Sequence, residues 1–466
     1  MTRLVRSASI VVLLTALAAS AQRPRTLDQE YREVAGRLIG AAMVDEGGWE
    51  KLSYLTTRIG NRLSGSTNLE KATQWVVDKM KSDGLDNPRL QAVKVPKWVR
   101  GRESATIVEP FNRPLNMLGL GSSIATPPQG ITASVVVVGS FDELQALGEA
   151  KVRGKIVVYD VEWKGYGATN VYRTNGASRA AQLGAVASLV RSMTGNSLYT
   201  PHTGNQNYAD GVTRIPAAAI TVEDAALIRR LTDAGQDVQV RLQMEAQMMP
   251  DADSANVIGE VTGRERPDEV VVLGGHIDSW DVGQGAHDDG GGIVAAWQAV
   301  TLIKQLGLKP RRTVRVVAWT NEENGGRGGA AYGATPGGNT RKHVAAIEMD
   351  GGAERPVGFG FTIPNAPADG PVVAAARQKL MQIAKLLEGI GSNAISNGGG
   401  GSDIAPLGQQ GVPTMSLQTI GEHYFDWHHT NADTLDKVNP QDLRKAIATL
   451  AVMAYILADM PDTLAP

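Results

Sequence analysis

The sequence predicts an α/β protein in which a mostly parallel sheet carries helices on both faces, with a second, smaller α/β unit inserted into the chain. Two observations support this fold class. After residue 253, buried runs of β-branched residues alternate with amphipathic segments of helical length, as in a parallel sheet covered on both faces. Between residues 129 and 244 the runs are shorter and the helical segments are rich in small residues, which indicates a separate unit.

The N-terminal residues 1–21 are predicted to be a signal peptide. Arg3 and Arg6 precede an apolar stretch at residues 10–19, and Ala-Ser-Ala at 19–21 supplies the small residues that a signal peptidase accepts. The alternative is an uncleaved anchor helix, but the stretch is shorter than the ~20 residues that cross a bilayer. We therefore expect an exported protein, secreted or periplasmic, that begins at Gln22 and has no membrane span after signal cleavage.

Residues 22–110 are predicted to form the first, helical part of the main domain. The first helix is indicated by apolar side chains at helical spacing, namely Leu27, Tyr31, Val34, Leu38 and Ala42. A second helix is predicted at residues 69–81, ended by Gly84.

Residues 111–252 are predicted to form the inserted unit, bounded near Pro110 and Pro250. Its predicted helices cover residues 176–184 and a segment that opens at Thr221. Its β-rich runs lie at residues 135–138, 155–161, 185–192, 217–220 and 238–244.

Residues 253–466 are predicted to complete the main domain, which the insert interrupts. Strands are expected at residues 269–275, 313–320, 344–349 and 414–417, and helices at 292–306, 372–387 and 440–460.

The composition excludes several classes of function. With 46 Lys and Arg against 48 Asp and Glu, the formal charge is -2, so the chain lacks the basic excess that binds nucleic acid. The sequence contains no cysteine, which excludes disulfides and thiol chemistry. We expect no nucleic-acid partner.

Polar clusters follow three of the predicted strands at their carboxyl ends. His276 and Asp278 come after residues 269–275, Glu322 and Glu323 after 313–320, and Asp350 after 344–349. Open α/β sheets bind their ligands at this edge. In a pair of adjacent residues the side chains point in different directions, so one glutamate can bind a metal while the other acts as a base.

Two further clusters complete the candidate site. Asp288 and Asp289 lie in GQGAHDDGGG, and His428 and His429 lie in HHTNADT near the C-terminus. Imidazoles and carboxylates without thiolates suit zinc, and suit manganese or cobalt less well. Five residues from five loops, one of them bridging, can hold two ions ~3.5–4 Å apart.

Each of these clusters is also a common feature without a function. Asp-Asp before glycine is usually a turn, and Glu-Glu is an ordinary start of a helix. The prediction of a metal site rests on their combination, because the clusters occupy equivalent ends of consecutive strands.

The motifs HID, GAHDDGGG, TNEENGG, EMD and HHTNADT together resemble the co-catalytic zinc exopeptidases of peptidase family M28, over about residues 115 to 460. The resemblance implies two zinc ions per chain. It makes His276 and Asp350 ligands of one ion, Glu323 and His429 ligands of the other, and Asp288 the bridge between them.

The resemblance also implies three further roles. Glu322 becomes the general base that acts on a zinc-bridging water, and Asp278 the carboxylate that orients His276. Many members have tyrosine immediately before the last histidine ligand, where this chain has His428. His428 could donate a hydrogen bond to the developing oxyanion in its place, or could be a neighbour without a role.

The family further implies a protease-associated domain at 111–252, a homodimer, and a dipeptide or short peptide substrate with free termini. Two alternatives stay open. A two-metal phosphoesterase would use similar ligands, but apart from Arg327 no cluster of Arg or Lys lies near the motifs to bind a phosphate. A catalytically inactive, receptor-like member of the same fold would lack a ligand or the base, and none is missing here.

Overall fold

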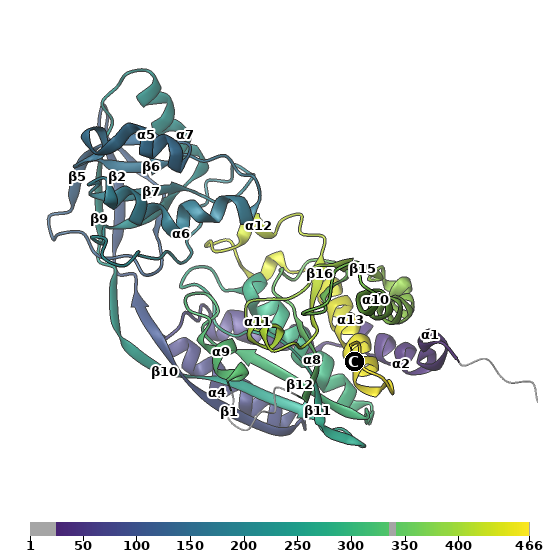
Figure 1. Cartoon of the computed structure of the whole chain (residues 1–466). Coiled ribbons are helices and arrows are strands. Elements are labelled where there is room, and N and C mark those ends of the chain that lie inside the picture. The colour runs from purple at the N-terminus through teal and green to yellow at the C-terminus, as the bar shows by residue number, and fades with distance from the viewer. Residues whose placement is uncertain (1–24, 335–341, 466) are drawn as a thin grey trace, which may run out of the picture.

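The computed structural model describes residues 25–334 and 342–465, which form two units, each built around an eight-stranded sheet (Figure 1). The predicted signal peptide lies outside the described residues. Two long antiparallel strands, β1 (Asp86–Val99) and β10 (Gln247–Val261), belong to the larger sheet and lead into and out of the smaller unit. The smaller unit is therefore inserted between two strands of the larger one.

The larger sheet is parallel at its centre, and antiparallel pairs flank this centre on both sides, while β14 and the edge strand β15 pair in parallel with each other. Its order is β1-β10-β12-β11-β13-β16-β14-β15. The central strands β12, β11, β13 and β16 pair in parallel, whereas β1–β10, β10–β12 and β14–β16 pair antiparallel. The remaining bounds are β11 (Arg266–His276), β12 (Arg312–Trp319), β13 (His343–Glu348), β14 (Pro356–Thr362), β15 (Ala394–Asn397) and β16 (Thr414–Thr419).

Four of the seven strand pairings among the described residues of this sheet are parallel, so the prediction of a mostly parallel sheet holds for the majority of pairings, and the sheet as a whole is mixed. The buried central strands form continuous apolar runs, which made them recognisable. Strand β1 alternates exposed and half-buried side chains and contains charged residues along its length, so it has no such run. Its pairing with β10 stabilises it instead.

Helices cover both faces of the larger sheet, as predicted. On one face α8 and α13 pack against each other and against α2, and their side chains form one large core with the sheet. On the other face α9 and α11 cover a smaller apolar cluster around Trp319. The helices of this unit are α1 (Leu27–Glu30), α2 (Arg32–Met43), α3 (Gly47–Tyr54), α4 (Thr67–Ser82), α8 (Gly291–Gln305), α9 (Arg327–Gly333), α10 (Pro371–Ala384), α11 (Ala405–Gln409), α12 (Tyr424–Trp427) and α13 (Pro440–Asp459).

The smaller sheet has the order β3-β2-β9-β5-β6-β7-β8-β4, with β5 to β8 parallel. Its elements are β2 (Glu103–Glu109), β3 (Arg113–Leu115), β4 (Met117–Gly119), β5 (Ile131–Val138), α5 (Phe141–Val152), β6 (Ile156–Tyr159), α6 (Tyr166–Gln182), β7 (Ala187–Arg191), β8 (Ala217–Ile220), α7 (Val222–Asp233) and β9 (Gln239–Met244). Strand β2 precedes Pro110, so the smaller sheet takes a strand from the segment that we assigned to the main domain. The turn signal at Pro110 falls between β2 and β3, which pair with each other.

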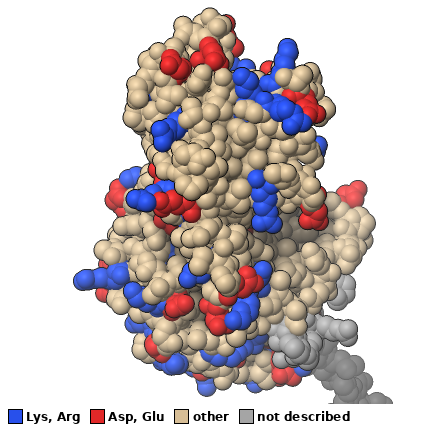
Figure 2. All heavy atoms as spheres, turned by 90° about the vertical axis from the view of Figure 1, so that its left-hand side faces the viewer, with Lys and Arg blue, Asp and Glu red and all other residues tan. Residues whose placement is uncertain are grey.

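The surface carries both signs of charge. On the face shown in Figure 2, Lys and Arg are interspersed with Asp and Glu over both units. None of the described helices combines the length and the apolarity that crossing a bilayer requires.

Candidate metal centre

The predicted site residues meet at one edge of the larger sheet. His276 is the last residue of β11, while Glu322 and Glu323 follow β12 and Asp350 follows β13. Strand β11 pairs in parallel with both β12 and β13, so the carboxyl ends of the three strands lie together. The topology therefore brings these side chains from distant parts of the sequence into one cluster.

Asp288 lies at the centre of the cluster, between two imidazoles. Its Oδ1 is 3.2 Å from Nε2 of His276, and its Oδ2 is 3.2 Å from Nε2 of His429. Each imidazole also has a second carboxylate: Oδ1 of Asp350 is 3.5 Å from Nε2 of His276, and Oε2 of Glu323 is 3.0 Å from Nε2 of His429. The five residues thus form two groups that share Asp288.

These side chains fit a metal ion. Among the described residues, His276, Asp288 and Asp350 form one group whose ligand atoms lie within 4.8 Å of one another, and Asp288, His428 and His429 form another. Nε2 of His276, Oδ2 of Asp288 and Oε1 of Glu323 are buried and make no hydrogen bond within the described part of the chain. Buried polar atoms without hydrogen bonds are rare in proteins, and ligation by a cation would satisfy them.

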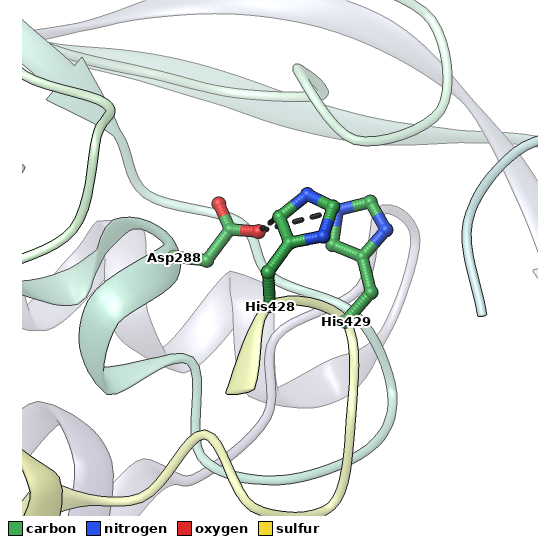
Figure 3. Close-up of side chains that lie close together, drawn as sticks. All are labelled: Asp288, His428 and His429. Carbon is green, nitrogen blue, oxygen red and sulfur yellow. Dashed lines mark ion pairs between the residues drawn. The ribbon is translucent and has the colours of Figure 1, made fainter. Parts of the chain in front are cut away.

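His428 and His429 both face Asp288, as Figure 3 shows. Their rings stack with centroids 3.5 Å apart, and Nε2 of His428 lies 3.7 Å from Oδ2 of Asp288, farther than that of His429. Oε2 of Glu323 lies 3.0 Å from Nε2 of His429. His428 and Glu323 are therefore both candidates for the ligand that would share an ion with His429 and Asp288. The shorter distances favour Glu323 with His429.

The buried groups shift one another's pKa values. Burial alone would lower the pKa of His276, but the neighbouring carboxylates of Asp288 and Asp350 raise it well above its usual value. Burial also opposes charge on His429, yet Glu323 and Asp288 raise its pKa to about 10. Burial raises the pKa of Glu323 to about 8 and that of Asp350 to about 6. The carboxylates need positive charge nearby, and a divalent cation supplies it when it displaces the imidazole protons.

Asp278 supports the cluster from behind and is fully buried. Its main-chain carbonyl oxygen lies 2.9 Å from Nδ1 of His276, whereas its carboxylate Oδ1 is 3.8 Å away. The carboxylate instead accepts hydrogen bonds from the backbone N–H groups of Glu322 and Glu323, at 3.1 and 3.3 Å. Asp278 therefore orients His276 through its main chain, not through its carboxylate as expected, because the carboxylate is occupied in holding the Glu-Glu pair.

Comparison with known proteins agrees with this geometry. Residues 256–454 match the sequence signature of peptidase family M28. The chain is 44% identical to carboxypeptidase Q of Mus musculus over 437 residues, which cover 93% of this chain and 91% of the mouse protein. It is also 44% identical to carboxypeptidase Q of Homo sapiens over 435 residues, covering 93% of this chain and 90% of the human protein.

The chain belongs to peptidase family M28. It is accordingly a metallo-exopeptidase. The crystal structure of a peptidase M28 precursor from Shewanella amazonensis has a TM-score of 0.89 and 36% identity, and the match covers 94% of this chain and 99% of that one. An aminopeptidase from Aneurinibacillus has a TM-score of 0.64 at 20% identity, covering 92% of this chain and 97% of that one, which shows the shared fold.

Two buried aspartates of this M28 peptidase, Asp433 and Asp289, hold the loops of the site in place, and their roles do not follow from the motifs in which they lie. Asp433 accepts hydrogen bonds from the backbone N–H groups of Ala286, His287 and Asp288, at 3.0, 2.7 and 3.1 Å. It lies within the HHTNADT motif, but nothing in that motif indicates which backbone it would contact. Asp433 keeps Asp288 in place from a position far along the chain.

Asp289 is likewise a supporting residue. Its Oδ2 accepts the N–H of His276 at 3.0 Å and its Oδ1 accepts the N–H of Gly292 at 3.1 Å. A Cβ at Gly292 would lie 1.9 Å from the carbonyl oxygen of Met349 and 2.2 Å from Oδ1 of Asp289. The close approach of these three segments explains why residue 292 is a glycine.

The smaller unit completes the site of the M28 peptidase. The backbone N–H of Thr203 donates to the carbonyl oxygen of His429 at 3.0 Å, and the carbonyl oxygen of Thr203 lies 3.2 Å from Nδ1 of His429. His429 has a φ of 61°, in the left-handed region, so these contacts stabilise a strained backbone. Both units line a cleft of about 340 Å³, formed by Tyr166, Asn170, Arg173, Thr174, Asn205, Asp288, Glu322, Glu323, Asp350, Ser402, Tyr424, Phe425, His428 and His429.

Proposed function

We propose that the chain is a dizinc exopeptidase that hydrolyses dipeptides or short peptides with free termini. The observation that supports this most is the position of Asp288, whose two carboxylate oxygens face two different imidazoles, each paired with its own second carboxylate. Sites with two neighbouring metal ions occur in aminopeptidases and in phosphoesterases, and membership of family M28 favours the peptidase.

In this proposal His276 and Asp350 hold one zinc ion, Glu323 and His429 hold the other, and Asp288 bridges them. Bound zinc polarises the carbonyl group of the scissile peptide bond and makes water easier to deprotonate. The protein supplies the geometry, because His276, Glu323 and Asp350 lie at or just after the ends of buried strands. Asp288 lies just before α8, and His429 follows α12.

Glu322 acts as the general base. Its side chain is 19% exposed and lines the cleft, whereas that of the neighbouring Glu323 is 2% exposed and faces His429. Because Asp278 fixes the backbone of both residues, the two carboxylates keep these different directions. Glu322 takes a proton from the attacking water and later delivers it to the leaving amine.

His428 donates a hydrogen bond to the oxygen that becomes negative during the reaction. Burial and the neighbouring His429 hold the pKa of His428 well below its usual value, so the ring is neutral. A neutral imidazole carries one N–H, and this N–H can serve in the cleft that His428 lines.

The proposal extends to the whole chain. We propose that residues 1–21 are removed as a signal peptide during export, that the unit between β1 and β10 is a protease-associated domain, and that the chain forms a homodimer. The mass of the N-terminal peptide of the exported protein tests cleavage, and light scattering tests the dimer.

Elemental analysis and one pair of variants test the mechanism. We expect two zinc equivalents per chain, because five ligands with one bridge exceed the needs of a single tetrahedral ion. Glu322→Gln should keep both ions and lower kcat by roughly 10²–10⁴-fold, the usual contribution of general-base catalysis. Glu323→Gln, the matched neighbour, should instead lose zinc.

Three results would count against this function. One zinc equivalent at saturation would exclude the bridged pair, and full activity of Glu322→Gln would exclude it as the base. A wild-type protein that binds two ions but cleaves no peptide would favour the receptor-like alternative, and cleavage of a phosphoester in place of peptides would favour the phosphoesterase.

A further inference from the structure

Arg173 is a buried cation at the edge of the metal centre. It belongs to α6 of the smaller unit and is 4% exposed. Its Nη2 donates to the hydroxyl of Tyr166 at 2.5 Å and its Nη1 donates to the carbonyl oxygen of Thr203 at 3.3 Å, while Nη1 lies 3.4 Å from Nδ1 of His429. Its Nε is buried and makes no hydrogen bond within residues 25–334 and 342–465.

No carboxylate bonds to the guanidinium of Arg173 among the described residues, because its partners are the oxygens of Tyr166 and Thr203 and Nδ1 of His429. Two other deeply placed arginines have a carboxylate: Arg312 pairs with Glu269, and Arg100 pairs with Asp281. Arg62 has none, but each of its three nitrogens donates to a main-chain carbonyl oxygen, whereas Nε of Arg173 has no hydrogen bond among the described residues. Taking a guanidinium out of water without a counter-charge is costly, so such a group is expected where a ligand brings the anion.

Arg173 places positive charge on one part of the cleft. Among the described residues that line the cleft, Arg173 is the one Lys or Arg side chain, and Asn170, Thr174 and Asn205 beside it are neutral. The same cleft is also lined by the carboxylates of the metal centre and by Glu322. An anionic group of a substrate would therefore be attracted to the wall formed by α6 and repelled by Glu322.

Aromatic packing holds this wall rigid. The ring of Tyr166 stacks on Phe425 at 5.4 Å and meets His428 edge-on at 5.3 Å, and the guanidinium of Arg173 lies over the same ring at 5.3 Å. In Figure 1, α6 lies beside α12, the helix that contains Phe425. Tyr166 thus fixes the guanidinium relative to the metal centre before any substrate binds.

We propose that Arg173 is the receptor for the free α-carboxylate of the substrate. The proposal rests on the peptidase function proposed above and adds the residue that selects the substrate. Because Arg173 lines the same cleft as Glu322 and the metal-ligand carboxylates, the carboxylate that it binds lies close to the scissile bond. The leaving group is then a single amino acid, so the enzyme acts as a dipeptidase or carboxypeptidase rather than releasing long peptides.

Matched substrates and variants test this receptor in the zinc-loaded full chain. The substrates are L-alanyl-L-alanine, its C-terminal amide, and L-alanyl-L-glutamic acid with an amidated α-carboxyl group. The variants are Arg173→Met and, as the control, Arg179→Met, which removes an arginine of the same helix that lies over Phe141 and does not line the cleft.

We expect the wild type and Arg179→Met to prefer the free dipeptide over its amide by roughly 10- to 100-fold in kcat/KM, as for a charge-assisted hydrogen bond. Arg173→Met should lose this preference, because KM should rise more for the free dipeptide than for the amide. The dipeptide with glutamic acid and an amidated α-carboxyl group should be cleaved no better than the amide of L-alanyl-L-alanine, because Arg173 binds the α-carboxylate and not a side-chain carboxylate.

Equal cleavage of the free dipeptide and the amide by the wild type would overturn the proposal, as would an unchanged preference in Arg173→Met. Efficient cleavage of the glutamate amide would reassign the receptor to a side-chain carboxylate and overturn the stated substrate class. A second measurement avoids the variant altogether: calorimetry on the wild type should show L-alanine binding at least roughly tenfold tighter than L-alaninamide. Equal binding would refute the receptor, whereas failure of the peptidase function itself would appear in the zinc content and in Glu322→Gln.

Discussion

Replacing Asp433 tests how the metal centre is held in place. The Asp433 side chain is 3% exposed and accepts three backbone hydrogen bonds, from Ala286, His287 and Asp288. A buried N–H group that loses its acceptor costs about 1–3 kcal/mol. Asp433→Ala leaves three such groups and should therefore lower the free energy of unfolding by about 3–9 kcal/mol, a large part of the stability of a typical domain.

Asp433→Asn should lower the free energy of unfolding less than Asp433→Ala does, and it should also weaken zinc binding. The amide oxygen can still accept from Ala286 and His287, whereas the amide NH₂ faces the N–H of Asp288, so one bond is lost at about 1–3 kcal/mol. Because the lost bond is the one that holds Asp288, zinc affinity should fall by roughly 10- to 100-fold, as for other residues that support a metal ligand.

Urea unfolding and zinc competition with a chelator measure the two effects separately. Asp436→Ala is the matched control, because Asp436 lies on the same segment but is exposed and bonds to Thr434 and Lys437, away from the metal centre. This control should change stability by less than about 0.5 kcal/mol. If Asp433→Asn unfolded like the control and bound zinc with wild-type affinity, the role assigned to Asp433 would be refuted.

Two further predictions concern the histidine pair and a buried lysine. His429→Ala should lose one zinc equivalent, whereas His428→Ala should keep both and slow the reaction, and elemental analysis showing the reverse would exchange their roles. Burial lowers the pKa of Lys51 from 10.5 to about 8 despite the neighbouring Asp83. The unfolded chain therefore binds more protons between these pH values, and the free energy of unfolding should rise by up to about 3 kcal/mol as pH increases across that window. Lys51→Met should lack this rise when urea unfolding is repeated at successive pH values; a parallel rise in the variant would contradict it.

Much of the larger unit was predictable because its determinants are local. The buried runs that became β11 and β12 and the periodicity that became α8 and α13 are each contained in fewer than about 25 consecutive residues. The polar clusters at the strand ends were recognisable for the same reason, since chemistry at the carboxyl ends of parallel strands follows from strand direction alone.

The edges of the sheet could not be predicted in this way. Strands β1 and β10 have mixed polar sequences, and they become strands because they pair with each other across the whole smaller unit. Strand β2 belongs to the smaller sheet because it pairs with β9, more than a hundred residues later in the chain. The predicted boundary near Pro110 followed a local turn signal, and the sequence contains no local sign of this distant pairing.

By itself, the sequence determined which kinds of side chain stand at the ends of the central strands, and therefore that this protein carries a site of imidazoles and carboxylates. Only the tertiary structure decided what surrounds that site. Arg173 meets His429 across 256 residues, and Asp433 meets Asp288 across 145. Such contacts depend on how two units and several loops pack, and the free energy of that packing is distributed over the whole chain, so no local pattern of residues records it.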